Sequence, residues 1–208
     1  MAPKFISFCG IDGSGKTTQA QMLVKYFNRI GAKVVHIHGF KPYKYSSELK
    51  KIANETNNSF NDLFSNDIRT VSFILDLLDV TMNTVLPALK EDCIVIAEKY
   101  FLDTKIYAPL LGTNRKIIEL FNNIVPVPDL YILLNISAEE SICRIKKRAK
   151  IKNIEIAPKE SIDIAYKAQQ EFMLYCEKHK ENCTIIDAER DIQSIHLQIK
   201  KTVNNIIF

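Results

Sequence analysis

The stretch FISFCGIDGSGKTTQAQ, from Phe5 to Gln21, decides the fold. Its apolar run, Phe5–Cys9, is typical of a buried β-strand, and the residues after Lys16 follow a helical pattern. Between them, Gly10-Ile-Asp-Gly-Ser-Gly-Lys-Thr17 fits the pattern G-x-x-x-x-G-K-[ST]. Glycines let backbone N–H groups converge on an anion, and the positive end of the following helix points at the same place. The stretch therefore predicts a strand, a phosphate-binding loop and a helix.

The side chains of this loop are expected to have separate tasks. Lys16 would reach the β- and γ-phosphates of a bound nucleotide, and the Thr17 hydroxyl would ligate Mg²⁺. The residues expected to line the phosphates of ATP are Gly10, Gly13, Ser14, Gly15, Lys16, Thr17 and Thr18. A phosphate loop alone leaves ATPases, GTPases, motors and kinases open. The chain has no N-K-x-D run for guanine, and its third strand ends CIVIAEKY, with Glu98 where ATPase motors place a metal-holding carboxylate.

Short β-branched or aromatic runs alternate with helical patterns along the chain. The predicted strands are Phe5–Cys9, Lys33–His38, Cys93–Ala97, Leu130–Leu134 and Thr184–Ile186. The predicted helices are Thr18–Ile30, Ile68–Leu89, Ser137–Lys150, Pro158–His179 and Ile192–Ile207. The strands are nearly continuously apolar, and the alternation predicts a parallel α/β sheet with right-handed crossovers and helices on both faces. No repeat or linker divides the chain, so we expect one domain over residues 1–208, with a polar, mobile flap at Arg144–Glu160.

Composition sets broad limits on the class of protein. Hydrophobic residues make up 47% of the 208 residues, charged residues make up 25%, and the formal net charge is +4. These values predict a globular chain, and the mild positive charge suits an anionic small molecule about as well as nucleic acid, so by itself it does not decide between them. The five cysteines lack the spacing of a zinc site and are interpreted as reduced thiols of a cytosolic protein. Since no signal segment or run of about 18 apolar residues is apparent, we expect a cytoplasmic protein without a membrane partner.

Beyond the phosphate loop, an ordered series of motifs resembles the thymidylate kinases, a family of P-loop nucleoside-monophosphate kinases. FCGIDGSGKTTQ is similar to that family's loop, and Phe73 and Asp76 with Leu86–Leu89 resemble its thymine-side helix. Further similar segments are EKYFLDTKIYAPLLG, PDLYILLNISAEESICRIKKR, PKESIDIAYKAQQEF and IIDAERDIQSI. The resemblance implies a three-layer P-loop NTPase fold, with a five-stranded parallel sheet flanked by helices and a short helical lid at residues 144–158. It also implies transfer of the ATP γ-phosphoryl group to dTMP or a related nucleoside monophosphate, with Mg²⁺, by an enzyme that is usually a homodimer.

The resemblance also implies roles for residues on the acceptor side. Asp12 would contact the sugar 3′-hydroxyl of the acceptor, and Phe73 would stack on its base. Lys99 would contact the acceptor phosphate, and Tyr107 would complete the acceptor site. Three of these residues have plain structural alternatives. Asp12 could merely shape its loop, Phe73 could merely pack in a core, and Lys99 could form a surface ion pair with Glu98 after the strand.

Other residues would act on the metal and on the transferring group. Glu98 would join Thr17 in the Mg²⁺ shell. The residues expected to neutralise the charge of the transferring phosphoryl group are Lys16, Lys99, Arg144 and Arg148. Arg144 and Arg148 lie four residues apart and share a helix face, whose plain alternative is a solvated basic surface. We expect no nucleic-acid partner, because no aromatic residues interleave these charges.

Several positions depart from the family pattern and leave the acceptor open. Leu77 stands where the family has an arginine that hydrogen-bonds thymine, and Asp103 and Ala108 replace a serine and a glutamine. The turn HGFKPYKY lacks the family's arginine. The alternatives are therefore a kinase of the same fold that acts on a nucleoside or another small metabolite, and a non-catalytic ATP-binding relative.

The four histidines do not cluster with cysteines or acids. They are His36, His38, His179 and His196. His38 ends a predicted strand beside the expected acceptor pocket, so it is a weak candidate for the acceptor side, and its plain alternative is a surface histidine with satisfied hydrogen bonds.

Overall fold

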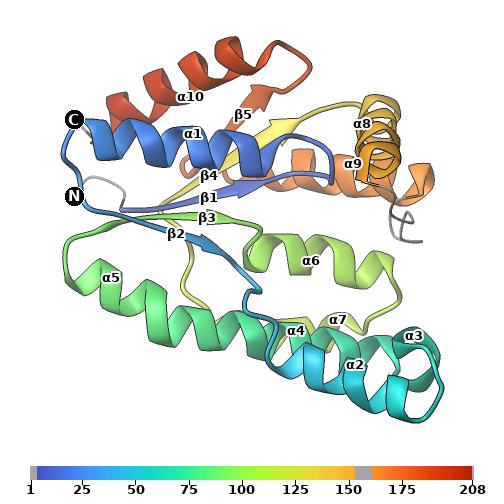
Figure 1. Cartoon of the computed structure of the whole chain (residues 1–208). Helices are drawn as coiled ribbons and strands as arrows, with labels where there is room; N and C mark the ends of the chain where they lie inside the picture. The colour runs from blue at the N-terminus through green and yellow to red at the C-terminus, as the bar shows by residue number, and fades with distance from the viewer. Residues whose placement is uncertain (1–3, 153–160, 208) are drawn as a thin grey trace.

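A five-stranded parallel sheet forms the centre of the computed structural model, which describes residues 4–152 and 161–207. The strands are β1 (Phe5–Cys9), β2 (Val34–His38), β3 (Ile94–Glu98), β4 (Leu130–Asn135) and β5 (Cys183–Asp187). Their order across the sheet is β2-β3-β1-β4-β5, and all four strand pairs are parallel (Figure 1). The predicted sheet is confirmed, and β1 with its phosphate loop lies at its centre.

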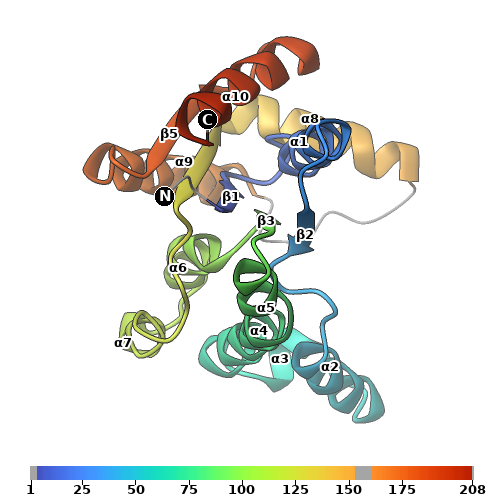
Figure 2. The same ribbon diagram turned by 90° about the vertical axis from the view of Figure 1, so that its left-hand side faces the viewer.

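Helices cover both faces of this sheet. The helices are α1 (Lys16–Arg29), α2 (Tyr45–Glu55), α3 (Phe60–Leu63), α4 (Asn66–Val80), η1 (Thr81–Val85), α5 (Leu86–Lys90), α6 (Phe101–Leu110), α7 (Arg115–Glu119), α8 (Ala138–Lys152), α9 (Ile162–Lys178) and α10 (Ile192–Ile207). Helices α1 and α10 lie on one face, and α4, α5 and α6 lie on the other (Figures 1 and 2). Of these, α2, α3, α6 and α7 were not among the predicted helices.

The sheet is apolar because it is buried on both sides. Every residue of β1 is buried, and Ile6, Phe8 and Cys9 have no exposed surface. One cluster of buried residues joins β1 and β4 to α1, α9 and α10, and a second joins β3 to the long helix α4–η1–α5. Strands that are buried on both faces have nearly continuous apolar sequences for this reason. The predicted strand ends agree with the observed ones to within one residue.

Helices α4, η1 and α5 form one continuous helix of 25 residues, Asn66–Lys90. By length and composition alone this helix could cross a membrane, with a mean hydropathy of 1.4 over its most apolar window. Its buried side chains, among them Ile74, Leu77 and Val85, pack in the second core cluster. A core helix passes the same test as a membrane span, and here the apolar face is explained by packing on the sheet.

The predicted flap is helical over the part that the structure describes. Residues 144–152 extend α8, so Arg144 and Arg148 are held on a regular helix. Residues 153–160 lie outside the described part of the chain, and with them the rest of the expected lid and the predicted start of α9 at Pro158.

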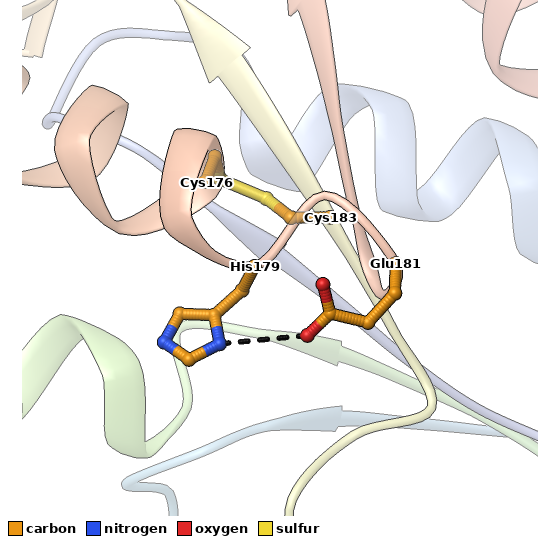
Figure 3. The surroundings of a disulfide bond; sticks show 4 residues. All are labelled: Cys176, His179, Glu181 and Cys183. Carbon is orange, nitrogen blue, oxygen red and sulfur yellow. Dashed lines mark ion pairs between the residues drawn. A yellow bond between two sulfur atoms is a disulfide. The ribbon is translucent and has the colours of Figure 1, made fainter.

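The prediction that all cysteines are reduced is wrong. Cys176 near the end of α9 and Cys183 at the start of β5 form a disulfide, with Cα atoms 5.3 Å apart (Figure 3). The tight turn between the helix and the strand brings the two residues together, and no local spacing rule signals such a pair. Cys9, Cys93 and Cys143 are free.

Candidate active site

The phosphate loop between β1 and α1 needs its glycines for conformation and for space. Gly10, Gly13 and Gly15 have φ values of 128°, 86° and 96°, a region that other residues resist. A Cβ atom on Gly10 would lie 2.7 Å from the Leu134 carbonyl oxygen, and one on Gly13 would lie 2.8 Å from that of Ser141. The loop is therefore packed tightly between the end of β4 and α8.

The loop ends at the positive terminus of α1. Helix α1 is described in full, and it has neither a side-chain cap at Gly15 nor an acidic residue in its first turn. Its N-terminal dipole is therefore not offset by a carboxylate of its own, and such a terminus attracts an anion. This arrangement matches the phosphate site that the sequence predicts.

Lys16 is folded back onto the loop. Its Nζ donates hydrogen bonds to the carbonyl oxygens of Gly10 at 2.7 Å and Ile11 at 2.9 Å, and the residue is only 6% exposed. Burial lowers the pKa of Lys16, while the nearby Asp12 carboxylate acts in the opposite direction. A buried ammonium whose hydrogen bonds go to carbonyl oxygens can exchange them for charged phosphate oxygens, which are stronger acceptors.

Thr17, in the first turn of α1, contacts Glu98 at the end of β3. The Thr17 hydroxyl donates a short hydrogen bond to Glu98 Oε2, and Glu98 is 6% exposed. The other carboxylate oxygen, Oε1, lies 3.1 Å from His36 Nε2. Burial alone would raise the pKa of Glu98, but the hydrogen bonds from His36 and Thr17 outweigh it and lower that pKa. The interpretation that no histidine clusters with an acid is therefore wrong for His36.

A hydroxyl and a carboxylate at this position suit Mg²⁺. In the described residues no group of three or more His, Cys, Asp and Glu side chains could hold a metal by itself. Mg²⁺ in nucleotide sites commonly takes one or two protein oxygens and completes its shell with phosphates and water. The hard oxygen donors of Thr17 and Glu98 fit that pattern.

Three of the residues expected on the acceptor side come together at the other end of the loop. Lys99 Nζ lies 2.7 Å from Asp12 Oδ1, and Lys16 Nζ lies 3.8 Å from the same oxygen. The Asp12 backbone N–H donates to the Tyr107 hydroxyl at 3.3 Å. Although burial lowers the pKa of Lys99, its ion pair with Asp12 dominates and raises it. The cluster therefore places two lysine charges beside one loop carboxylate.

The backbone at Lys99 is unusual and directs this side chain. Lys99 has φ of 60°, a left-handed conformation that costs free energy for a residue with a Cβ. Gly39, which follows β2, lies against it: a Cβ there would come within 1.9 Å of the Lys99 carbonyl oxygen. The Gly39 N–H donates to that oxygen at 3.0 Å. The β2 turn thus supports the strained residue that reaches Asp12.

Asp103 is a buried carboxylate beside the two lysines. It is 4% exposed, and its Oδ2 accepts a hydrogen bond from the Tyr100 N–H at 3.3 Å. Burial raises the pKa of Asp103 to about 6, against the opposing pull of Lys16 and Lys99. Because this pKa still lies below physiological pH, the aspartate that replaces the family's serine adds a buried carboxylate that is mostly ionised there.

Phe73 belongs to an aromatic cluster on the α2–α4 side. Its ring centroid lies 6.2 Å from those of Phe40 and Phe60. Lys50 Nζ lies 5.6–5.9 Å from the rings of Tyr43, Phe60 and Phe73. Phe73 is half-buried, so one part of its ring packs and another part is open. Lys50 carries no motif, and sequence reasoning missed it.

Two other positions of the thymine-side motif have structural roles. The Asp76 carboxylate accepts hydrogen bonds from the backbone N–H groups of Tyr45 and Ser46, at the start of α2. Leu77 has no exposed surface and packs in the core with Ile74. Asp76 therefore stabilises the N-terminus of α2, and Leu77 is a core residue.

The two arginines of α8 differ in their surroundings. Arg144 is half-buried, and its Nε lies 2.8 Å from Glu140 Oε1, while Arg148 is exposed. Helix α8 reaches the phosphate loop at Ser141, whose hydroxyl donates to the Asp12 carbonyl oxygen. The helix that carries the arginines is thus anchored to the loop, one turn before Arg144.

A glycine loop at the end of a central parallel strand, with a buried lysine and a threonine–glutamate pair beside it, defines a P-loop nucleotide-binding protein. The chain belongs to the thymidylate kinase family, since that family's model, described as "Thymidylate kinase", matches residues 8–199. The chain is therefore a member of a family of ATP-dependent nucleoside-monophosphate kinases, and the resemblance inferred from its motifs is confirmed.

Similar proteins cover nearly the whole chain. A "Probable thymidylate kinase" of Pyrococcus horikoshii is 28% identical over 201 residues, which span 97% of this chain and 96% of the relative. A "Thymidylate kinase" of Caldicellulosiruptor saccharolyticus is 27% identical over 213 residues, covering 100% of this chain and 98% of the relative. A "Thymidylate kinase" of Desulfotalea psychrophila is 31% identical over 144 residues, which span 68% of each chain.

Proposed function

We propose that this chain transfers the γ-phosphoryl group of ATP to dTMP and forms dTDP, with Mg²⁺, in the cytoplasm. The observation that carries the proposal is that one loop holds both ends of the reaction. Its glycines and Lys16 face the donor site, while Asp12 in the same loop pairs with Lys99, 2.7 Å away, on the acceptor side. Donor and acceptor phosphates would therefore meet over a single rigid segment.

On the donor side, the loop N–H groups, the N-terminus of α1 and Lys16 would bind the phosphates of ATP. Thr17 and Glu98 would hold Mg²⁺, which when bound neutralises charge on the β- and γ-phosphates. Lys16 would leave the Gly10 carbonyl oxygen and donate to phosphate oxygens instead.

On the acceptor side, the attacking group of a nucleoside monophosphate is a phosphate oxygen, which needs no strong general base. The task of the protein is to align two anions and to screen their repulsion. Lys99 would bind the acceptor phosphate, Asp12 would bind the sugar hydroxyl, and Tyr107 would support the loop at Asp12. Arg144 and Arg148 would neutralise the transferring group.

A second candidate function is phosphorylation of a nucleoside or another small metabolite by the same fold. The observation that favours it is Leu77, which is fully buried in the core and has no hydrogen-bond donor in its side chain. It stands at the position where the family has an arginine that hydrogen-bonds thymine. Phe73 could stack on a base in either case.

The test measures ADP release from Mg-ATP with purified full-length chain and a panel of nucleoside monophosphates and nucleosides. Turnover with dTMP far above all others supports the proposal, and turnover with unphosphorylated acceptors alone refutes it in favour of the second candidate. Lys16→Ala should abolish transfer and leave the circular dichroism spectrum unchanged. Lys25→Ala, on the exposed face of the same helix, is the matched control and should retain full activity.

The proposal includes one kinase domain over residues 1–208, with a lid near residues 144–158, and a homodimer. Apolar residues repeat at heptad spacing along the long helix, at Ile68, Val71, Leu75, Leu78 and Met82. Three of these residues are between 39% and 49% exposed: Ile68, Leu75 and Met82. A second copy packed on this stripe would bury it in the manner of a helix seam. Sedimentation velocity should give a dimer for the wild type and a monomer for Leu75→Glu, while Leu174→Glu on exposed α9 surface should remain dimeric.

A further inference from the structure

His36 is the one histidine among the described residues that contacts a carboxylate of the candidate active site. It lies on β2, where it faces Ile96 of β3 in the strand register, two positions before the pair His38–Glu98. Its Nε2 is 3.1 Å from Glu98 Oε1, while Glu98 Oε2 accepts the hydrogen bond from Thr17. Each oxygen of the Glu98 carboxylate therefore has its own partner, one from α1 and one from β2.

This two-sided contact has a mechanical consequence. A glutamate side chain has three rotatable bonds before its carboxylate, so its oxygens are poorly fixed unless other groups hold them. If the Thr17 hydroxyl turned to a metal, the His36 contact would still hold the Glu98 carboxylate from the β2 side. Groups that hold a metal ligand in this way tune the affinity of the site although they do not touch the metal.

We propose that His36 is a positioning residue for Glu98, and through it for the divalent metal that accompanies the bound nucleotide. The inference rests on the proposed function for the role of Glu98. His36 itself touches neither nucleotide nor metal.

The surroundings of His36 argue against a role in packing. Its side chain is 26% exposed, and it belongs to neither core cluster of the described residues. It lies in the wall of an open cavity of about 620 Å³, which also includes Lys41, Asp79 and Asn83. His38, on the same face of β2, contacts Phe40 and Tyr43 by its ring instead. Loss of the His36 ring therefore removes a contact to Glu98 and little packing.

The test compares His36→Ala with His36→Gln in the full-length chain. Glutamine keeps an N–H donor at a similar distance from its Cβ, whereas alanine removes the donor. The matched control is His179→Ala, because the half-buried His179 has its Nδ1 3.6 Å from Oε1 of the exposed Glu181, in a pair beside the disulfide (Figure 3). The probe is Mn²⁺ with a non-hydrolysable β,γ-imido analogue of ATP, and free Mn²⁺ is measured by electron paramagnetic resonance.

We expect His36→Ala to weaken Mn²⁺ binding in the nucleotide complex about tenfold. His36→Gln should recover most of this loss, and His179→Ala should equal the wild type. Binding of the nucleotide analogue without metal, measured in EDTA, should be the same in all four proteins, which separates a metal effect from damage to the phosphate loop.

Two results would overturn the inference: unchanged Mn²⁺ affinity in His36→Ala, or equal losses in His36→Ala and His36→Gln. These outcomes are distinct from failure of the proposed function. The wild type could bind Mn²⁺ and nucleotide but phosphorylate no dTMP, while His36→Ala still lowers the affinity for Mn²⁺. In that case the acceptor assignment fails and the role of His36 stands.

Discussion

Replacing Asp103 with asparagine removes a carboxylate from a buried site beside Lys16 and Lys99. The side chain is 4% exposed, and its Oδ1 has no hydrogen-bond partner among the described residues. Asparagine keeps an oxygen that can accept from the Tyr100 N–H, which now donates to Oδ2 at 3.3 Å. The substitution therefore removes the charge and preserves the contact at the start of α6.

The expected gain in stability follows from the pKa. Burial raises the pKa of Asp103 from 3.8 to about 6 in the folded protein. The folded state then binds the proton more tightly than the unfolded state, so wild-type stability falls as the pH rises from about 4 through about 6. Below that window the carboxyl is protonated in both states and carries no penalty. Above it the full penalty applies, and the difference between the two pKa values corresponds to about 3 kcal/mol.

Urea denaturation followed by circular dichroism measures this difference. We expect Asp103→Asn to match the wild type near about pH 4 and to be more stable by about 3 kcal/mol near about pH 7.5. Asp163→Asn, which changes an exposed carboxylate in the first turn of α9, is the matched control. This control should show no gain in stability over the wild type as the pH rises over the same range.

The reasoning fails if the gain of Asp103→Asn is the same at both pH values, because the effect would then come from shape and not from charge. It fails also if the variant is less stable than the wild type near about pH 7.5. That result would mean that the ionised carboxylate gains more from Lys16 and Lys99 than it loses by burial.

Three further predictions concern single contacts. Lys99→Ala should lower kcat/KM for the acceptor about 100-fold, because it removes the positive charge near Asp12. Lys99→Arg keeps that charge and should restore most of the activity. An unchanged kcat/KM in Lys99→Ala would exclude Lys99 from the acceptor site. Leu77→Ala should lower the free energy of unfolding by about 3 kcal/mol in urea, because a fully buried leucine leaves a cavity, and a loss below about 1 kcal/mol would contradict its core position. Reduction of the Cys176–Cys183 disulfide with dithiothreitol should lower the free energy of unfolding by about 2 kcal/mol, because it frees a short loop in the unfolded chain. Identical urea midpoints with and without reductant would contradict this stabilisation.

Much of the fold could be predicted because it depends on local rules. The phosphate loop is a contiguous pattern whose glycines are needed where the backbone takes positive φ. Parallel strands covered on both faces are apolar throughout, and α10 was predicted with its observed bounds, Ile192–Ile207, from its periodicity. Helix α2 was missed because its N-terminus is stabilised by Asp76, a residue of another helix.

The candidate site was predicted in part. Asp12, Lys99 and Tyr107 were singled out by motif, and they do meet. The contact of His36 with Glu98 was not foreseen, because the two residues are far apart in the chain and neither lies in a histidine motif. Side chains alternate along a strand, so His36 and His38 lie on one face of β2. This alternation was the one sequence feature that pointed to a contact between His36 and Glu98.

The sequence by itself determined the phosphate loop, the parallel sheet and the family, because each follows from residues that are neighbours in the chain or from an ordered series of motifs. Only the tertiary structure decided how the side chains share charge. The parallel sheet brings the ends of β1, β2 and β3 to one edge, where Thr17, His36 and Glu98 meet. Burial at that edge then raises the pKa of Asp103 and lowers that of Lys16, since desolvation depends on packing that no local pattern encodes.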